Sequence, residues 1–374
     1  MLRKAVWGLV SYLVGSAATA ALAAGVGGSE TSATVWVPDY YGRYVTVNTL
    51  TDPSTIASTK IALSSRSCNP NSVAVENGDL YVVCNSDFGG KDEILVFNAT
   101  SYAYVKTISG IGTDGNNYFS GSSLVAILFD AHGNLWTSGY NAGTLLRVPK
   151  SSLASSRPRV DREVIDSPTT PAGLALDSDK SIWVVGQYDG GIVLNFSDSA
   201  LNQPGTFLQT NPLNPSPSYC ISDSAGGCQQ VGGVFDNPEG VAVFQGSVWV
   251  SNNGGNAPTS TIVRLDKQAG NQLSASTYGG TLNTPFACPG GMFAAKGPAK
   301  VETLWINDEG RNVANSDCGA SAADQSAKAG LVMEFLNAGL TAANQAAPKP
   351  DQFTNWQKLT TSSPGFGGIF VQLN

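Results

Sequence analysis

Short apolar runs recur along the chain in pairs, and a few polar or glycine residues join the two runs of each pair. The second run of each pair carries an aromatic residue, at Trp36, Tyr81, Trp136, Trp183, Trp249 and Trp305. These six positions lie 45 to 66 residues apart. Recurrence at such a period is typical of a repeat architecture, and runs this short are typical of strands.

A leading apolar run precedes all but the first aromatic run: Ser72–Val75, Val125–Phe129, Gly173–Leu176, Gly240–Val243 and Gly291–Ala294. Turn residues such as Asn77-Gly78 and Gln245-Gly246 separate the two runs, which predicts a β-hairpin in each unit. A third strand is predicted after each hairpin, over residues 44–47, 94–97, 144–148, 192–196, 261–265 and 331–335. A weaker fourth strand follows in most units, as over 60–63, 104–108 and 354–359.

Four short antiparallel strands repeated at this period predict the blades of a β-propeller. The first unit lacks a leading strand, and the C-terminal run Gly367–Leu373 matches the missing one. Pairing that run with the first unit would remove open sheet edges. We therefore predict an all-β fold over residues 33–374, a six-bladed β-propeller of four-stranded antiparallel blades closed by the C-terminal strand. A β-sandwich or several small β-domains is the alternative.

Composition supports strands over helices. Charged residues make up only 13% of the chain, against about 25% in ordinary soluble domains, so long helices would lack the Lys, Glu and Arg that cover their solvent faces. Hydrophobic residues reach 42%, which argues against disorder. The net charge is −7, and the chain has no run of basic residues, so we expect no sequence-independent nucleic-acid binding.

Residues 1–23 have the pattern of a secretory signal peptide. Arg3 and Lys4 precede an apolar, alanine-rich stretch, and Ala21-Leu22-Ala23 forms a small-x-small cleavage site. An uncleaved membrane anchor is the alternative, since about 20 apolar residues can span a bilayer. We expect residues 24–32 to be a short linker, and the mature protein to be secreted or periplasmic, monomeric and free of membrane segments.

Six cysteines in an exported protein predict disulfides rather than thiol chemistry. Cys220 and Cys228 bracket a short Ser/Gly loop and are expected to pair. They lie within residues 202–236, a Pro/Ser/Gly-rich stretch that we predict to be an insertion between the fourth and fifth blades.

The repeated motif Pro-x-Gly-[Leu/Val]-Ala-[Leu/Val], followed by Trp-Val, resembles that of NHL-repeat propellers. It stands at Pro171–Asp177 and Pro238–Val243, with weaker copies at Pro70–Val75 and Pro289–Met292. The wider group that it resembles includes six-bladed propellers of the senescence-marker-protein/gluconolactonase family and virginiamycin B lyase. Because the shared residues pack the blades, the resemblance implies a fold more strongly than a function.

In propellers of this resemblance the leading strand lines a central channel. The loop before that strand and the loop after the aromatic strand emerge on one face, which takes the ligand. The resemblance therefore implies a ligand-binding face that contains Asp39, Tyr40, Asn85, Tyr140, Asn141, Tyr188, Asp189, Asn252 and Asn307; the same loops hold Gln187 and Asn253. We expect this face to bind a protein, a peptide or a glycan. The same placement pairs Cys68 with Cys84, and Cys288 with Cys318.

Gluconolactonase-like enzymes hold a divalent metal in the channel through Glu, Asn and Asp side chains from different blades. The corresponding positions here carry Glu239 and Asn71, and Asp308 is a candidate third ligand from a loop. Their oxygens suit Ca²⁺ or another divalent cation. The other blades carry no oxygen side chain at this position, so the implied set is incomplete. The alternative is that these polar residues cap turns and satisfy backbone groups.

The single histidine, His132, lies in a predicted hairpin turn away from this face. Its position disfavours chemistry of the virginiamycin B lyase type, which uses a histidine near the metal, and Ser or Cys nucleophiles that need a histidine base. One histidine also excludes a zinc site with two histidine ligands. The sequence thus favours a binding or scaffold module, with a divalent-metal-dependent lactone or ester hydrolase as the alternative, and leaves open whether the protein is an enzyme.

Overall fold

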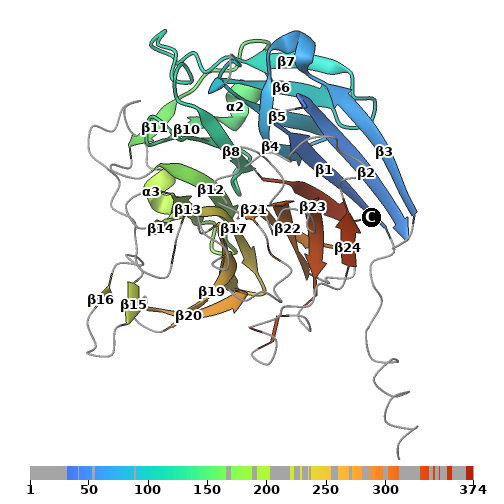
Figure 1. The fold of residues 1–374 in the computed structure, drawn as a ribbon. Helices are drawn as coiled ribbons and strands as arrows, with labels where there is room; N and C mark the ends of the chain where they lie inside the picture. Colours follow the sequence, from blue (N-terminus) through green and yellow to red (C-terminus); the bar gives the residue numbers. More distant parts are fainter. Residues whose placement is uncertain are drawn as a thin grey trace, which may run out of the picture.

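The computed structural model of the chain is built from six β-sheets (Figure 1). It describes residues 32–40, 42–52, 55–87, 90–165, 170–187, 192–202, 220–222, 228–229, 235, 237–253, 260–268, 272–279, 286, 288–297, 302–310, 329–336, 340–341, 345, 352–355 and 368–373. The predicted signal peptide and linker therefore lie outside the described residues. Among the described residues, no helix has the length and apolar character needed to cross a membrane.

The first three sheets each have four antiparallel strands. The first sheet contains, in spatial order, β25 (Phe370–Leu373), β1 (Ala33–Asp39), β2 (Tyr44–Asp52) and β3 (Thr55–Ala62). The second contains β4 (Asn69–Glu76), β5 (Asp79–Asn85), β6 (Glu93–Asn98) and β7 (Tyr104–Ile108). The third contains β8 (Leu124–Phe129), β9 (Leu135–Gly139), β10 (Thr144–Val148) and β11 (Arg162–Ile165).

The other three sheets differ in strand number among the described residues. The fourth contains β12 (Pro171–Leu176), β13 (Ile182–Gly186) and β14 (Ile192–Phe196). The fifth contains β17 (Pro238–Phe244), β18 (Ser247–Asn252), β19 (Thr261–Lys267), β20 (Gln272–Gly279), β15 (Cys220–Ser222) and β16 (Cys228–Gln229). The sixth contains β21 (Pro289–Lys296), β22 (Glu302–Gly310), β23 (Ala329–Phe335) and β24 (Gln352–Asn355).

The expected four strands per blade therefore do not hold for the fourth and fifth sheets as described. After β14 the chain forms the short helix α3 (Asp198–Leu201), whose first turn is capped by the hydroxyl of Ser197 accepting from the Ala200 amide. In the fifth sheet, β15 from the predicted insertion pairs in parallel with β20. The other short helices are the 3-10 helix η1 (Ser64–Arg66) and α2 (Lys150–Leu153).

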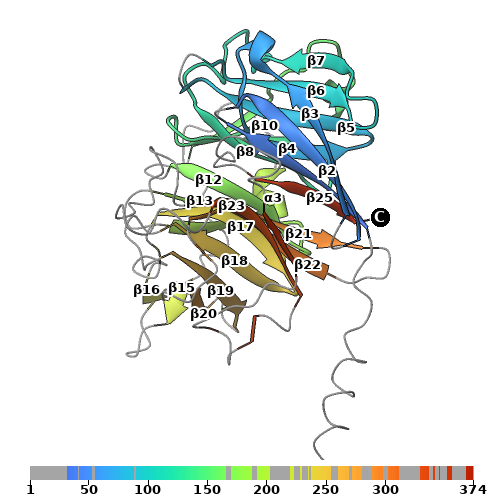
Figure 2. The ribbon, with the colours of Figure 1, turned by 45° about the vertical axis from the view of Figure 1, so that its right-hand side comes forward.

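The C-terminal strand belongs to the first sheet, as the sequence predicts. β25 pairs antiparallel with β1, with Phe370 opposite Trp36 and Leu373 opposite Ala33. In Figure 2 the C-terminal strand, drawn in red, lies beside the blue strands of the N-terminal half. The sheet built from the two ends of the described chain thus joins the last unit to the first.

Six inner strands lie around a common centre. In cyclic order β4, β8, β12, β17, β21 and β25 each contact the next, and β25 contacts β4. Six hydrophobic clusters fill the spaces between neighbouring sheets, and one of them joins the sixth sheet to the first. The arrangement is that of a β-propeller, in which each sheet buries both of its faces against its neighbours.

Tryptophans of the repeated motif lie in these clusters and hydrogen bond within their own unit. Trp136 donates its indole N–H to Asp130 at 2.9 Å, and Trp183 donates to Asp177 at 2.7 Å. Both carboxylates stand in the hairpin turn that follows the inner strand. The Asp of the sequence motif is therefore a structural partner of the buried indole.

Five inner strands shift register close to their first residues, as between Pro238 and Val241 in β17. Such bulges turn the chain sharply and place one side chain off the regular alternation. At this point neighbouring inner strands come close together. A Cβ on Gly240 would lie 2.3 Å from the carbonyl oxygen of Gly290, so the motif requires glycine there.

The predicted Cys68–Cys84 disulfide is confirmed, and it links the start of β4 to the end of β5. Cys288 is also disulfide-bonded, while its predicted partner Cys318 lies outside the described residues. The side chains of Cys220 and Cys228 lie outside the described part of the chain as well.

Candidate functional site

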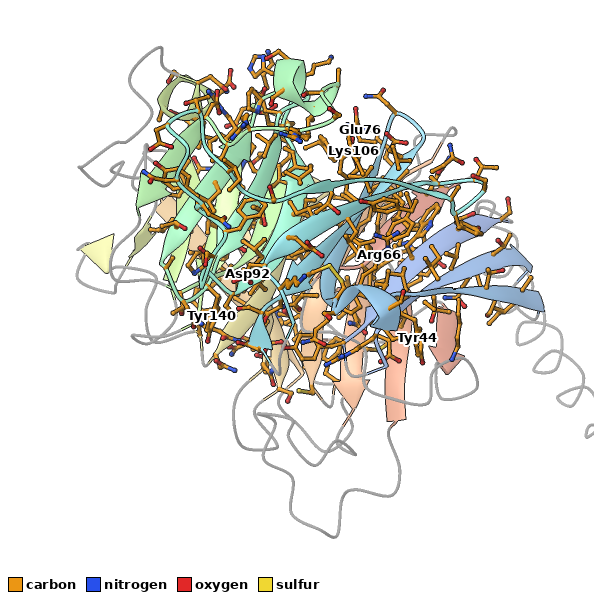
Figure 3. The ribbon with its side chains drawn as sticks, turned by 90° about the horizontal axis from the view of Figure 1, so that it is seen from above. Tyr44, Arg66, Glu76, Asp92, Lys106 and Tyr140 are labelled. Carbon is orange, nitrogen blue, oxygen red and sulfur yellow. A yellow bond between two sulfur atoms is a disulfide. The ribbon has the colours of Figure 1, made fainter. Side chains whose placement is uncertain are left out.

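A cavity of about 350 Å³ lies between the inner strands of all six sheets. Five of the inner strands run into hairpin turns; we call the end at which these strands begin the upper end, and the end with their hairpin turns the lower end. In Figure 3 the upper end faces the bottom of the picture, where Tyr140 and Asp92 are labelled, and Glu76 near the top of the picture marks the lower end. Most of the lining is apolar, including Ala126 and Ala242.

Glu239 is the carboxylate at the upper end of this cavity. It stands in the bulge of β17 and is only 3% exposed. Its Oε1 accepts hydrogen bonds from the amide of Asn253 at 2.6 Å and from the amide of Gln187 at 2.9 Å. Two neutral donors from two different sheets thus hold one carboxylate oxygen in place.

Equivalent positions of three consecutive sheets supply the groups around Glu239. The backbone amides of Tyr140, Gln187 and Asn253 donate to the carbonyls of Ser123, Thr170 and Asn237, each 3.1 Å away. These bonds tie the residue after the aromatic strand to the residue before the inner strand of its own sheet. The repeat therefore delivers three polar side chains to the upper end at matching positions.

The side chains form one directed chain of hydrogen bonds. The hydroxyl of Tyr140 donates to Oε1 of Gln187 at 2.5 Å, and Gln187 donates in turn to Glu239. On the far side, Oδ1 of Asn253 lies 3.0 Å from the sulfur of Cys288, which begins the sixth sheet. We call Tyr140, Gln187, Glu239 and Asn253 the mouth network. The described hydrogen bonds from Tyr140, Gln187 and the Asn253 amide run toward Glu239, whose carboxylate accepts them and can accept from a ligand donor or contact a cation.

The second sheet carries its own polar group at the upper end. Asn71, in the bulge of β4, is 3% exposed, and its amide contacts the Leu124 carbonyl at 3.5 Å. Its Oδ1 is buried and has no hydrogen-bond partner among the described residues. Asn85 donates to Ser123 Oγ at 2.9 Å and to the same Leu124 carbonyl at 3.2 Å. Asn71 and Asn85 thus join the second sheet to the third.

Several other predicted site residues are buried at the upper end and bond to backbone. Asp39 accepts from the Gly42 amide at 2.7 Å, and Asp308 accepts from the Cys288 amide at 2.9 Å. Asn252 donates to Thr261 Oγ1 at 3.2 Å. The Asp39 bond caps a turn and the Asp308 bond satisfies a backbone amide, which is the alternative that the sequence offered for these residues. The Asn252 bond instead joins two side chains of the paired strands β18 and β19.

The remaining predicted residues differ in placement. Tyr40 and Asn307 are buried, Asn141 is exposed, and Tyr188 and Asp189 lie outside the described residues. Glu239 and Asn71 belong to inner strands that are not neighbours in the ring. Among the described residues, no group of three or more His, Cys, Asp or Glu side chains is arranged to hold a metal.

His132 lies in the hairpin turn between β8 and β9, at the lower end. Its Nε2 is 2.8 Å from Oδ1 of Asp198 at the start of α3, and the imidazole side chain is 45% exposed. The histidine therefore links two neighbouring sheets far from the mouth network.

Asp92 stabilises a loop at the upper end, and it was not identified from the sequence. Asp92 accepts from the amides of Ser86 at 2.9 Å, Leu124 at 3.2 Å and Ser123 at 3.3 Å. It thereby fixes the loop after β5 against the start of β8. Asp92 is the last residue of the loop that follows the aromatic strand β5, and the residue collected from that loop, Asn85, stands at its beginning.

Comparison with known proteins supports the fold. No protein-family model and no curated protein sequence matches the chain. Among solved structures, a protein of unknown function from Bacteroides caccae is similar at TM-score 0.52 and 10% identity, over 91% of this chain and 98% of that one. A putative 6-phosphogluconolactonase from Bacteroides uniformis is similar at TM-score 0.50 and 11% identity, over 91% and 99%.

Virginiamycin B lyase from Staphylococcus aureus is also similar, at TM-score 0.48 and 13% identity, over 84% of this chain and 83% of that one. The structural neighbours are β-propeller proteins. At such low identity the likeness shows the β-propeller fold alone. The resemblance to NHL repeats stays a prediction.

Proposed function

We propose that the protein is an extracytoplasmic six-bladed β-propeller that acts as a binding module, with the ligand at the upper mouth of its channel. The observation that carries the proposal is the mouth network, in which Tyr140, Gln187 and Asn253 from three sheets converge on the buried carboxylate of Glu239. Burying polar groups costs desolvation free energy unless each one is hydrogen bonded. A few buried polar groups held in fixed orientations are typical of ligand-binding sites.

The chemistry of the network indicates the kind of ligand. A carboxylate accepts hydrogen bonds only, whereas tyrosine and carboxamide groups both donate and accept. The site therefore suits a ligand that presents N–H or O–H groups, such as a peptide segment of a protein partner or the hydroxyls of a glycan. The single disulfide with both cysteines described, Cys68–Cys84, fits export to an oxidising compartment.

The test is binding to an oligosaccharide array and a peptide library, followed by titration of the strongest binder. Glu239→Gln should lower its affinity about tenfold or more, because a hydrogen bond to a charged group contributes about 1.5–3 kcal/mol. Tyr140→Phe, which removes one hydroxyl, should lower it less. Gln268→Ala is the matched control, since Gln268 is an exposed carboxamide between β19 and β20 and lies outside the cavity lining. Absence of any binder, or equal binding by all variants, would contradict the proposal.

A divalent-metal-dependent lactone or ester hydrolase is the second candidate. Its specific support is Asn71, whose buried Oδ1 has no hydrogen-bond partner among the described residues and which occupies the bulge equivalent to that of Glu239. Glu239 and Asn71, with Asp308 as third ligand, offer the oxygen donors that Ca²⁺ prefers. A bound divalent cation would supply Lewis-acid polarisation of a carbonyl.

A thermal melt with and without added Ca²⁺ or Mn²⁺ decides between the two candidates. An ion at 100 times its dissociation constant adds about 2.7 kcal/mol to the free energy of unfolding. A rise in melting temperature that Glu239→Gln and Asn71→Ala both abolish would favour the hydrolase and lead to lactone assays. An unchanged melt at millimolar metal would remove this candidate and leave the binding module.

A further inference from the structure

The lower end of the channel is lined by apolar side chains, whereas the mouth network at the upper end is polar. Each of the six inner strands contributes one partly exposed apolar residue to the cavity lining in this half. Val75, Phe129, Leu176 and Val243 stand next to the hairpin turns, and Phe293 and Phe370 stand one register position farther in. Leu176 is 36% exposed. We call this set the lower ring. It is apolar lining that the fold leaves partly accessible, and exposed apolar surface marks binding sites.

Aromatic side chains dominate one side of the lower ring. Phe293 and Phe370 pack with their ring centroids 4.9 Å apart, and Phe370 also packs against Trp36 at 5.7 Å. These ring contacts hold Phe293 and Phe370 in place. Rings held in this way present a rigid wall to the cavity and lose little conformational entropy when a ligand binds.

The ionisable groups along the cavity are all acidic. Among the residues that line it, Glu239 and Glu76 are the only ionisable side chains, one at each end. Glu76 follows Val75 of the lower ring and is half-buried, and its Oε1 accepts a hydrogen bond from the exposed Asn77 at 3.1 Å. A carboxylate beside fixed aromatic rings is an environment that favours an organic cation.

Two neighbouring features strengthen this electrostatic argument. A second hollow of about 420 Å³ shares Val75, Glu76, Phe293 and Phe370 with the cavity, so the lower ring opens outward. The lysine of that hollow, Lys296, forms an ion pair with Glu302 at 3.3 Å.

We propose that the lower end of the channel is a second binding site, which takes a small organic ammonium ion with a compact aromatic or aliphatic body. The apolar body lies against the lower ring, and the ammonium group lies at Glu76. The cavity volume matches the lower range of small-molecule pockets, about 300–1,000 Å³. Anionic and sugar-like ligands are excluded because the ring offers neither a cation nor hydrogen-bond donors.

Three matched probes test the charge requirement: 2-phenylethylammonium, the neutral 2-phenylethanol and the anionic phenylacetate. Dissociation constants are measured on the whole protein by ligand-observed saturation-transfer NMR at pH 7. The ammonium ion should bind about tenfold more tightly than the alcohol, and phenylacetate should not bind. Equal binding of the ammonium ion and the alcohol would overturn the proposal in favour of a purely apolar pocket.

Four variants locate the site. Glu76→Gln should weaken the ammonium ion about tenfold and change the alcohol less than about twofold. Leu176→Ser should weaken both probes, whereas Asp79→Asn, the control in the same hairpin and outside the cavity lining, should change neither. Glu239→Gln separates this site from the proposed function, because Glu239 lies at the opposite end of the cavity and its loss of charge should weaken the ammonium ion much less than Glu76→Gln does. Loss of binding in Glu239→Gln but not in Glu76→Gln would overturn the proposal.

Discussion

The two ends of the channel are made by the same six strands and yet have opposite character. At the upper end five of the strands begin in bulges, glycines bring their backbones together, and buried polar groups such as Glu239 are bonded across sheets. At the lower end these five strands enter hairpin turns, and apolar side chains such as Leu176 stay exposed. The contrast separates a closely packed polar end, where buried side chains are held by hydrogen bonds, from an apolar end whose side chains stay partly exposed.

The difference is local, because each end follows a different constraint. At the upper end the backbones of neighbouring inner strands come so close that a Cβ at Gly240 has no space. The strands therefore contact each other there through backbone atoms. At the lower end the hairpin of β4 and β5 carries Gly78 at φ +82°, with nothing within 4 Å of an added Cβ. Glycine is required at the upper end by contact and at the lower end by conformation.

The largest expected effect on stability comes from replacing Gly240 with alanine. Gly240→Ala should lower the free energy of unfolding by about 3 kcal/mol or more, the upper range for overpacking, because the new methyl would meet backbone of β21. Gly78→Ala is the matched control and should cost only about 1–2 kcal/mol, the penalty for a left-handed alanine. Urea unfolding followed by circular dichroism measures both.

Equal losses in the two variants would contradict the contrast. A similar small loss in both would mean that the inner strands can separate at the upper end. Gly78 lies inside the loop that the Cys68–Cys84 disulfide closes, so mass measurement under non-reducing conditions must show that this disulfide is intact in both variants.

An intermediate effect is expected at Asp177, the turn carboxylate below the fourth sheet. Its side chain is fully buried, accepts from Trp183 and forms an ion pair with Lys267 of the fifth sheet. Burial alone would raise the pKa of Asp177, but the hydrogen bonds from Lys267 and Trp183 outweigh it and hold that pKa below its usual value. Asp177→Asn should therefore lower the free energy of unfolding by about 1.5–3 kcal/mol at pH 7.

The sign of the pH dependence follows from the lowered pKa. The contribution of Asp177 is fully present above the pKa of an unfolded aspartate, about 3.9, and is lost as the pH falls through the lower folded value. Melting temperatures from pH 7 to pH 2 should thus fall less steeply for Asp177→Asn than for the unmodified protein. Lys267→Met should reduce the steepness as well. A parallel pH profile in all three proteins would refute the assignment.

The smallest effect is expected in the lower ring. Leu176→Ser removes an exposed apolar side chain and should change the free energy of unfolding by less than about 0.5 kcal/mol. Val241→Ser, at a buried position on the inner strand of the fifth sheet, should cost several times more. If Leu176→Ser destabilised as strongly, the lower ring would belong to the folding core rather than to a binding surface.

Strand positions were largely predictable from the chain itself. β7, β10 and β14 have the bounds that the sequence predicts, and the C-terminal strand joins β1 as expected. Apolar runs bounded by turn residues carry this information locally. The number of strands in the fourth and fifth sheets was not predictable, because pairing of β15 with β20 joins segments about 50 residues apart.

The site was predictable only as a collection of loop residues. Gln187 and Asn253 were collected because of their position after an aromatic strand, but nothing in the sequence distinguishes them from the exposed Asn141. Asp92 was missed because its three backbone partners come from two separate loops. Which loop residues meet depends on how neighbouring sheets are rotated against each other.

The sequence by itself determined the repeated unit, the turn chemistry and the strand that joins the ends, while the Cys68–Cys84 pair was implied by the family resemblance and confirmed by the structure. These features depend on residues close in the chain or on apolar patterns that recur with the repeat. Only the tertiary structure decided that Glu239 receives amides from two sheets, that Asn71 Oδ1 is buried without a partner among the described residues, and that the lower ring stays exposed. Each of these depends on the distance between inner strands of different sheets, which no local pattern encodes.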